Sequence, residues 1–195
     1  PNFGLPKGGN AVSTYIPVAR VVDMLLGPGD EYDFNGERLT YPDIRMIYWA
    51  GGNPFHKHQD LNRFLKAWQK PETIIVNEPW WTPAARRADV VLPVTTTLER
   101  NDICSGLRDR FFVAMHQAVP PVGEARSDYD IITGLAERLG VVETFTEGRD
   151  EMSWLRHMYN NAQKSARKHD IEMPEFDQYW ERGIWEFQTP QESSI

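Results

Sequence analysis

The sequence contains a single cysteine, no long apolar run and no excess of positive charge. Cys104 alone cannot form an internal disulfide, nor supply the several thiolates of a structural zinc site or an iron–sulfur cluster. No stretch approaches the roughly 20 apolar residues of a membrane-spanning helix, so no membrane span is expected. The formal net charge is -7 without any basic run, which disfavours binding to a nucleic-acid backbone.

The proportions of hydrophobic and charged residues are those of a globular domain. The 195 residues are 41% hydrophobic and 25% charged, which is enough for one sizeable core. The chain starts with "PNFGLPKGG", which has neither an initiator Met nor a signal-peptide pattern. We therefore expect a piece of a longer polypeptide, whose remaining domains would be its partners. Neither periplasm nor cytoplasm is predicted, because a targeting signal would lie upstream.

Three apolar runs alternate with helical patterns in the middle of the chain. Strands are predicted at 44–50, 72–78 and 89–94, and helices at 61–68 and 82–88. This βαβαβ order predicts a parallel sheet. The first run is apolar at nearly every position, so it is expected to be the central strand, buried on both faces. The predicted fold is α/β: a Rossmann-like three-layer domain with a mostly parallel sheet.

The segments on either side of this unit are expected to be additions to it. Residues 1–15 are rich in Gly, Pro and Asn and predict a loop, and 16–43 predict a helix followed by a tight turn at an Asn-Gly pair. Beyond the sheet, apolar residues at helical spacing continue almost to the end of the chain. The expected division is an α/β domain over 1–145 and a C-terminal helical appendage over 146–195.

The loops after the three strands are the first candidate site. Right-handed crossovers place the carboxyl ends of parallel strands at one edge of a sheet, where ligands bind. Gly51, Gly52 and Asn53 follow the first strand, and glycines there let backbone N–H groups approach a phosphate. The same Gly-Gly-Asn-Pro sequence is also typical of an ordinary turn.

Two charged residues follow the other strands. Glu78 ends the second strand, where nucleotide-binding units often keep an acid for ribose hydroxyls; an acid at a helix N-terminus is the alternative. Arg100 follows the third strand and can clamp a pyrophosphate through its fork of donors. The alternative for Arg100 is a surface ion-pair cluster with Glu99 and Asp102.

Other chemistry is disfavoured by spacing. His56, His58 and Asp60 are two residues apart and would lie on opposed sides of a helix, so no metal ligand is predicted. No G-x-S-x-G elbow supports a hydrolase. The glycine loop lacks the G-x-G-x-x-G spacing of NAD-binding domains. No catalytic residue is predicted in this chain.

The motifs "IYWAGGNPFHKHQD", "ETIIVNEPWW" and "VVLPVTTTLERND" together resemble the molybdopterin oxidoreductases of the dimethyl sulfoxide reductase family. The resemblance is nearest to the biotin sulfoxide, dimethyl sulfoxide and trimethylamine N-oxide reductases, and its specific motifs span about 40–140. It implies that residues 1–145 hold one of two molybdopterin guanine dinucleotides in a molybdenum enzyme that removes oxygen from S-oxides or N-oxides. The isolated piece is expected to lack the cofactor and to be inactive.

The resemblance also implies cofactor contacts at particular positions. Relatives often have His where this chain has Lys57, and His-Asp where it has Asn77 and Glu78. Guanine N–H donors and ribose hydroxyls suit carboxylates, and the pyrophosphate suits Arg100; which carboxylate takes which group stays open. The predicted cofactor-binding residues are Gly51, Gly52, Asn53, Lys57, Asn77, Glu78, Arg100 and Asp130.

Two other functions remain open at this point. One is a non-catalytic, flavodoxin-like module that binds a free nucleotide or a partner protein, and a weaker one is an NAD-dependent enzyme. The sequence does not indicate which S-oxide or N-oxide is the substrate, the electron donor or the oligomeric state.

Overall fold

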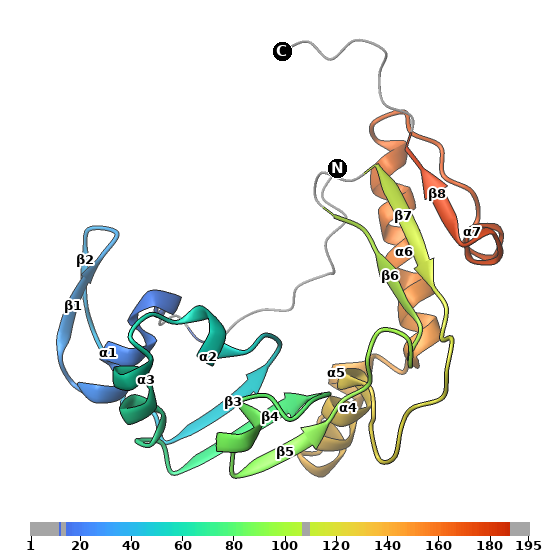
Figure 1. The fold of residues 1–195 in the computed structure, drawn as a ribbon. Coiled ribbons are helices and arrows are strands. Elements are labelled where there is room, and N and C mark those ends of the chain that lie inside the picture. Colours follow the sequence, from blue (N-terminus) through green and yellow to red (C-terminus); the bar gives the residue numbers. More distant parts are fainter. Residues whose placement is uncertain (1–11, 13–14, 107–109, 188–195) are drawn as a thin grey trace. The chain divides into compact units, whose positions relative to one another are not determined.

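The computed structural model describes residues 12, 15–106 and 110–187 (Figure 1). These residues form two compact units, a first unit up to Val94 and a second unit from Thr95 onward. Most of the loop predicted at 1–15 lies outside the described residues. The predicted division into 1–145 and 146–195 stays a prediction about the intact protein.

The first unit contains a parallel sheet. Its three strands are β3 (Met46–Ala50), β4 (Thr73–Glu78) and β5 (Val90–Pro93), in the order β3-β4-β5. The α/β class and the parallel pairing of the predicted βαβαβ segment are confirmed. The prediction that the first run is the central strand is wrong, because β4 occupies the centre and β3 an edge. β3 is apolar, but it is not buried on both faces, because Met46 is 59% exposed and Tyr48 is 37% exposed.

Short helices and turns connect the strands of the first unit. Asp60 caps α3, since its Oδ1 accepts the backbone N–H of Arg63 at 3.1 Å. The helix predicted at 82–88 is only a 3-10 turn, in which Thr82 Oγ1 accepts the N–H of Ala85 at 3.3 Å. The helical elements are η1 (Val18–Arg20), α1 (Val21–Leu26), α2 (Pro54–Lys57), α3 (Leu61–Trp68) and η2 (Ala85–Arg87).

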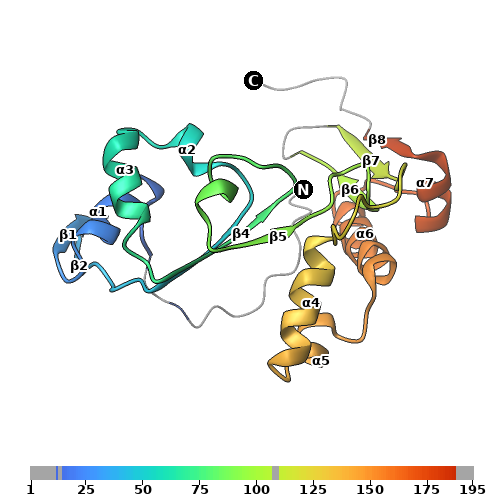
Figure 2. The ribbon, with the colours of Figure 1, turned by 60° about the horizontal axis from the view of Figure 1, so that its bottom comes forward.

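The core of the first unit lies between these helices and one face of the sheet. Aligned residues of parallel strands share a face, and the face that carries Trp49 and Val76 packs against α1 and α3, which lie side by side (Figure 2). The opposite face carries Met46, Tyr48 and Val90, all partly exposed. Within the described part of this unit, helices therefore cover one face, and a three-layer arrangement is not seen.

A β-hairpin precedes the sheet, as the Asn-Gly pair predicts. β1 (Glu31–Phe34) and β2 (Glu37–Thr40) pair antiparallel. Asn35 and Gly36 between them have φ angles of 52° and 81°, which is the positive-φ pattern of a two-residue hairpin turn.

The second unit contains an antiparallel sheet that the sequence analysis did not predict. Its strands β6 (Asp102–Cys104), β7 (Phe111–Met115) and β8 (Ile184–Glu186) lie in the order β6-β7-β8, so the sheets of the described residues are not mostly parallel. Helices are present where apolar residues at helical spacing predict them beyond the parallel sheet. The helices are α4 (Asp128–Arg138), α5 (Val142–Thr146), α6 (Glu151–Arg167) and α7 (Phe176–Arg182).

The core of the second unit joins the antiparallel sheet to the long helix α6. Phe112 of β7, Tyr159 of α6 and Tyr179 of α7 are buried together, and the two tyrosine rings stack with their centres 4.4 Å apart. The C-terminal helices thus share one core with the strands. No helix in the described ranges is both long and apolar enough to cross a bilayer.

Candidate functional site

The parallel sheet brings six of the eight predicted residues to one end of its strands. Ala50 pairs in register with Asn77, so the loop after β3 and the last residues of β4 are neighbours. Gly51 and Gly52 have φ angles of 78° and 67°, which only glycine adopts without strain. We call this group the strand-end cluster: Gly51, Gly52, Asn53, Lys57, Asn77 and Glu78.

Lys57 folds back over the glycine loop. A Cβ atom added to Gly52 would lie only 2.9 Å from Lys57 Nζ. The ammonium group thus lies directly against the backbone at Gly52, and any side chain at that position would have to displace it. The loop therefore combines close backbone access with a positive charge, which together favour an anionic ligand.

Asn53 has one satisfied and one unsatisfied polar atom. Its Oδ1 accepts the backbone N–H of Phe55 at 3.0 Å and so caps the short helix α2. Its Nδ2 is buried and has no hydrogen-bond partner among the described residues. A buried donor without a partner costs about 1–3 kcal/mol. An acceptor atom of a ligand at the glycine loop would remove this cost.

The two β4 residues of the cluster are oriented by neighbouring hydroxyls. Tyr48 donates to Asn77 Oδ1 at 2.9 Å, and Thr82 donates to Glu78 Oε2 at 2.9 Å. Asn77 is 5% exposed. An amide and a carboxylate thus stand in fixed orientations at the end of β4.

Arg100 belongs to the second unit, where its guanidinium group contacts two neighbouring residues. Its Nη1 donates to the Thr95 carbonyl at 3.1 Å, and its Nη2 lies 3.2 Å from Asp102 Oδ2. Of the ion-pair cluster considered as an alternative, the Arg100–Asp102 pair is present. Glu99 instead accepts N–H and O–H groups of Thr96 and the N–H of Val122. These bonds, the backbone bond of Thr96 first, lower the pKa of Glu99.

An aromatic cavity of about 670 Å³ lies beside Arg100 in the second unit. Ser127 also lines it, and the Ser127 hydroxyl donates to Asp130 Oδ2 at 2.8 Å. Arg100 and Ser127 thus line the same cavity, and Asp130 is hydrogen-bonded to Ser127. Trp154 Nε1 is buried there without a partner among the described residues. The remaining walls are Asn101, Asp102, Asp128, Tyr129, Thr144, Phe145, Glu147, Glu151, Leu155 and Met158.

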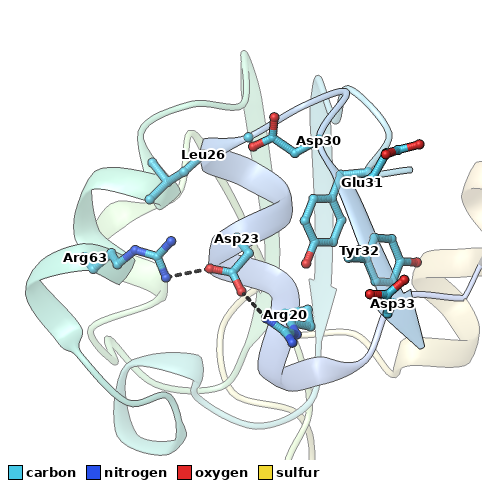
Figure 3. Close-up of a pocket in the computed structure, with 10 residues that line it drawn as sticks. Arg20, Asp23, Leu26, Asp30, Glu31, Tyr32, Asp33 and Arg63 are labelled. Carbon is cyan, nitrogen blue, oxygen red and sulfur yellow. Dashed lines mark hydrogen bonds and ion pairs between the residues drawn. The ribbon is translucent and has the colours of Figure 1, made fainter. Parts of the chain in front are cut away.

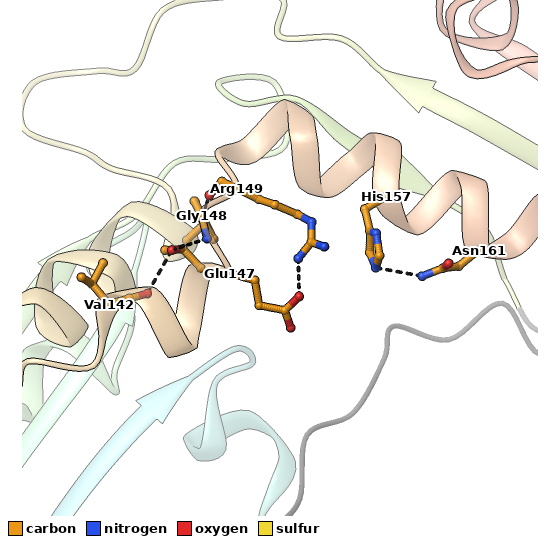
Figure 4. Close-up of polar contacts among 8 residues, drawn as sticks. Val142, Glu147, Gly148, Arg149, His157 and Asn161 are labelled. Carbon is orange, nitrogen blue, oxygen red and sulfur yellow. Dashed lines mark hydrogen bonds and ion pairs between the residues drawn. The ribbon is translucent and has the colours of Figure 1, made fainter.

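The turn between α5 and α6 contributes Glu147 to the wall of the aromatic cavity. Figure 4 shows the polar contacts of this turn. Thr146 ends α5 by donating to the Val142 carbonyl at 2.9 Å and accepting the N–H of Gly148 at 3.2 Å. Arg149 forms an ion pair with Glu147 and lies 4.7 Å from the centre of the Trp154 ring. Arg149 thus contacts two residues of the cavity wall, Glu147 and Trp154, and no sequence pattern indicated these contacts.

A second hollow, of about 580 Å³, lies between α1, the β-hairpin and α3 of the first unit (Figure 3). Asp23 lies at its centre and bridges Arg20 at 3.1 Å and Arg63 at 2.7 Å. Its pKa is lowered, chiefly by the hydrogen bond from Arg63. The ion pair of Asp23 with Arg63 ties α1 to α3, so we assign this hollow a structural role.

His58 of the sequence motif has a packing contact. The His58 ring stacks on Phe64 at 4.7 Å, and burial lowers the pKa of His58. No group of three or more His, Cys, Asp or Glu residues in the described ranges is arranged to bind a metal ion.

The fold and the strand-end cluster define an α/β protein with donors and acids gathered at the carboxyl ends of parallel strands. The chain belongs to the molybdopterin oxidoreductase family, whose sequence pattern matches residues 7–138. Its similarity to a solved structure, acetylene hydratase from Pelobacter acetylenicus, supports the fold alone. That match has a TM-score of 0.60 at 23% identity and covers 79% of this chain and 20% of the other.

Curated relatives are more similar in sequence. The chain is 54% identical to the biotin sulfoxide reductase of Cereibacter sphaeroides, over 88% of this chain and 23% of that protein. It is 54% identical to the dimethyl sulfoxide/trimethylamine N-oxide reductase of Rhodobacter capsulatus, over 90% of this chain and 22% of that protein. It is 53% identical to the trimethylamine-N-oxide reductase of Haemophilus influenzae, over 84% of this chain and 20% of that protein. The chain thus spans less than a quarter of these relatives.

Proposed function

We propose that the chain is part of a molybdenum-dependent S-oxide or N-oxide reductase and that it holds one molybdopterin guanine dinucleotide. The names of the relatives at 53% to 54% identity support this activity and this class of substrate. Membership of the family supports a molybdopterin cofactor. The guanine dinucleotide form is proposed because the resemblance of the sequence motifs implies it. The partners would be the remaining domains of the same polypeptide.

The observation that carries the proposal is the fit of the glycine loop to an anionic ligand. The buried, unpartnered Nδ2 of Asn53 needs an acceptor, and the ammonium of Lys57 lies against Gly52. Phosphate oxygens are acceptors that carry negative charge, so they satisfy both groups at once. A neutral apolar ligand would satisfy neither.

Each predicted residue has a role that follows from its chemistry. Lys57, Arg100 and the amides of the glycine loop would bind pyrophosphate oxygens. Glu78 and Asp130 are acceptors and would receive the N–H groups of guanine and the hydroxyls of ribose, with Asn77 beside Glu78. Thr82 and Ser127 already orient those two carboxylates by hydrogen bonds.

None of these residues is proposed to bond to the metal or to react. When bound, the cofactor supplies the two-electron molybdenum chemistry that removes oxygen from the substrate. The residues of this chain bind and orient the dinucleotide and neutralise its charge. The 195-residue chain alone is therefore expected to be inactive.

We further infer a Rossmann-like three-layer domain in the intact enzyme. The exposed apolar side chains on one face of the sheet, Met46, Tyr48 and Val90, support this inference because such a face is normally covered. The cofactor-holding domain over 1–145 and the helical appendage over 146–195 are kept as part of the same proposal.

A thermal-shift experiment separates this function from a non-catalytic flavodoxin-like module or an NAD-dependent enzyme. A ligand at 100 times its dissociation constant stabilises the folded state by about 2.7 kcal/mol. We expect GDP to raise the melting temperature of the chain more than NAD or FMN. A response to NAD or FMN alone would contradict the proposal.

The role of Arg100 is tested in the full-length enzyme. Arg100→Ala is expected to reduce the bound cofactor per polypeptide much more than it lowers the melting temperature. Arg110→Ala is the matched control, because Arg110 forms an exposed ion pair with Glu186 at 3.0 Å in the same unit. Equal losses of melting temperature and of molybdenum content in Arg100→Ala would point to a structural role instead. Assays with methionine, biotin and dimethyl sulfoxides and trimethylamine N-oxide would then identify the substrate.

A further inference from the structure

Trp49 lies immediately before the strand-end cluster and makes contacts that the predicted site does not include. Its indole Nε1–H lies 2.8 Å from the carbonyl oxygen of Gly52 and 3.1 Å from that of Gly51. One donor is therefore shared by two successive carbonyl groups of the glycine loop. We propose that Trp49 is the positioning residue of this loop and orients its backbone N–H groups toward the phosphates of the cofactor. The proposal rests on the function proposed above.

The orientation of these N–H groups follows from peptide geometry. The described residues contain no cis peptide bond, and in a trans peptide the C=O and N–H groups point in opposite directions. The Gly51 carbonyl shares its peptide unit with the N–H of Gly52, and the Gly52 carbonyl with the N–H of Asn53. Because both carbonyls face the indole, both N–H groups face away from it. Successive N–H groups that face the same way form a concavity suited to anions.

The indole is well placed for this task because its ring is anchored in the core. Trp49 packs edge-on against Trp68 with ring centres 5.6 Å apart, and Trp68 is 2% exposed. Glycine residues have the most backbone freedom of any residue, so a two-glycine loop would lose much entropy when it binds a ligand. A rigid donor that fixes the loop beforehand reduces this loss. Trp49 thus connects the hydrophobic core to the ligand side of the sheet.

The same core provides a matched control. Trp68 Nε1 donates to the carbonyl of Arg87 at 3.0 Å, away from the glycine loop. Trp49→Phe and Trp68→Phe therefore each remove one indole N–H donor that is bonded to the backbone, within one cluster of aromatic rings. Both variants should lower the melting temperature, but only Trp49→Phe should release the glycine loop.

The experiment uses the full-length enzyme purified with its cofactor. After prolonged dialysis, guanine released by acid hydrolysis is measured per polypeptide, together with the melting temperature and the hydrogen exchange of the amides at 51–53. In Trp49→Phe we expect about a tenfold weaker retention of guanine, equivalent to about 1.4 kcal/mol, and faster exchange in the loop. Trp68→Phe should keep the wild-type guanine content and the wild-type exchange at 51–53.

Two outcomes would overturn the proposal. One is equal guanine content in Trp49→Phe and Trp68→Phe at similar melting temperatures, and the other is unchanged exchange at 51–53 in Trp49→Phe. If Trp49→Phe does not fold, benzothienylalanine at position 49 keeps the shape of the ring and lacks only the N–H donor. A wild-type enzyme without any guanine dinucleotide would instead contradict the proposed function, and this case is recognised from the wild-type sample alone.

Discussion

The two units of the chain fix their predicted site residues by different means. In the first unit, the register of a parallel sheet brings the glycine loop and the end of β4 together, and a core tryptophan fixes the loop. In the second unit, Arg100 and Asp130 are oriented by polar partners, namely the Thr95 carbonyl and the Ser127 hydroxyl. The glycine loop thus depends on sheet register and on a tryptophan packed against the core as well as on hydrogen bonds, whereas the described contacts that orient Arg100 and Asp130 are polar. Core substitutions and polar substitutions should therefore affect the two units differently.

The largest effect is expected from a core truncation in the first unit. Phe64 is fully buried and packs against Phe55 and Trp68 at 4.9 and 5.4 Å, so Phe64→Ala should destabilise this unit by about 3–5 kcal/mol. The cores of the two units are separate clusters, so amides of the second unit should keep more of their protection from hydrogen exchange.

The control for this prediction is Phe112→Ala, which removes a 4% exposed ring from the core of the second unit. It should reverse the pattern and expose β7 amides first. If both variants accelerate exchange equally throughout the chain, the two units unfold together and the comparison between them fails.

The sequence predicted the first unit better than the second. The strand runs and the Asn-Gly turn are local signals, and the structure has strands and a hairpin at these places. The antiparallel sheet of the second unit was missed because its signals are short and distant. β6 and β8 have three residues each, and β8 pairs with β7 across a long stretch of chain. Periodicity within a window does not reveal such pairing.

The site residues show the same limit. Glycines after a strand and an acid after the next strand could be chosen from pattern and resemblance, and the sheet brings those positions together. The residues that orient these glycines and this acid could not be predicted from the sequence. The hydrogen bonds of Trp49 to the loop and of Thr82 to Glu78 depend on side-chain rotamers and loop conformation. The edge position of β3 was also missed, because an apolar run does not show how many strands pair beside it.

The next smaller changes in stability are expected from a pair of glycine substitutions, one in each unit. Gly52→Ala places a Cβ at a φ of 67° and 2.9 Å from Lys57 Nζ, and the backbone strain alone costs about 1–2 kcal/mol. Gly134 lies inside α4, where a Cβ would meet Arg138 Nη1 at an ordinary 3.7 Å. Gly134→Ala should therefore stabilise the chain by about 0.5–1 kcal/mol.

Urea unfolding of both glycine variants measures the predicted difference in sign. The loop conformation would be less constrained than we infer if Gly52→Ala were neutral. If Gly134→Ala destabilised the chain, α4 would have packing on that side which the described residues do not contain.

The carboxylates with lowered pKa values provide a comparison by pH and salt. Glu99 is stabilised by N–H and O–H donors of Thr96 and the N–H of Val122, and Asp23 by Arg63 and Arg20. A lowered folded-state pKa gives stability that is present above the unfolded-state pKa and is lost as pH falls through the folded-state value. Glu99→Gln and Asp23→Asn should thus be less stable than wild type at neutral pH and approach it in acid.

Salt distinguishes the two carboxylates, because only Asp23 has charged partners. Added salt screens partly exposed ion pairs. The loss of unfolding free energy in Asp23→Asn should therefore become smaller with salt, while the loss in Glu99→Gln should persist. Unfolding free energies measured across pH at low and high salt test this. The assignment of Glu99 to uncharged donors would be wrong if salt reduced both deficits equally.

The smallest effects are expected from the two stacked tyrosines in the core of the second unit. Burial raises the pKa of both phenols, yet only one hydroxyl has a partner. Tyr159 donates to the Pro174 carbonyl at 2.8 Å, whereas the buried hydroxyl of Tyr179 has no partner among the described residues. Tyr159→Phe should therefore cost about 0.5–1.5 kcal/mol, the usual net value of a hydrogen bond. Tyr179→Phe should be neutral or slightly stabilising, because it removes a desolvated polar group and keeps the ring. Paired unfolding curves of the two variants measure this difference, and a destabilised Tyr179→Phe would reveal a partner for that hydroxyl, such as a buried water.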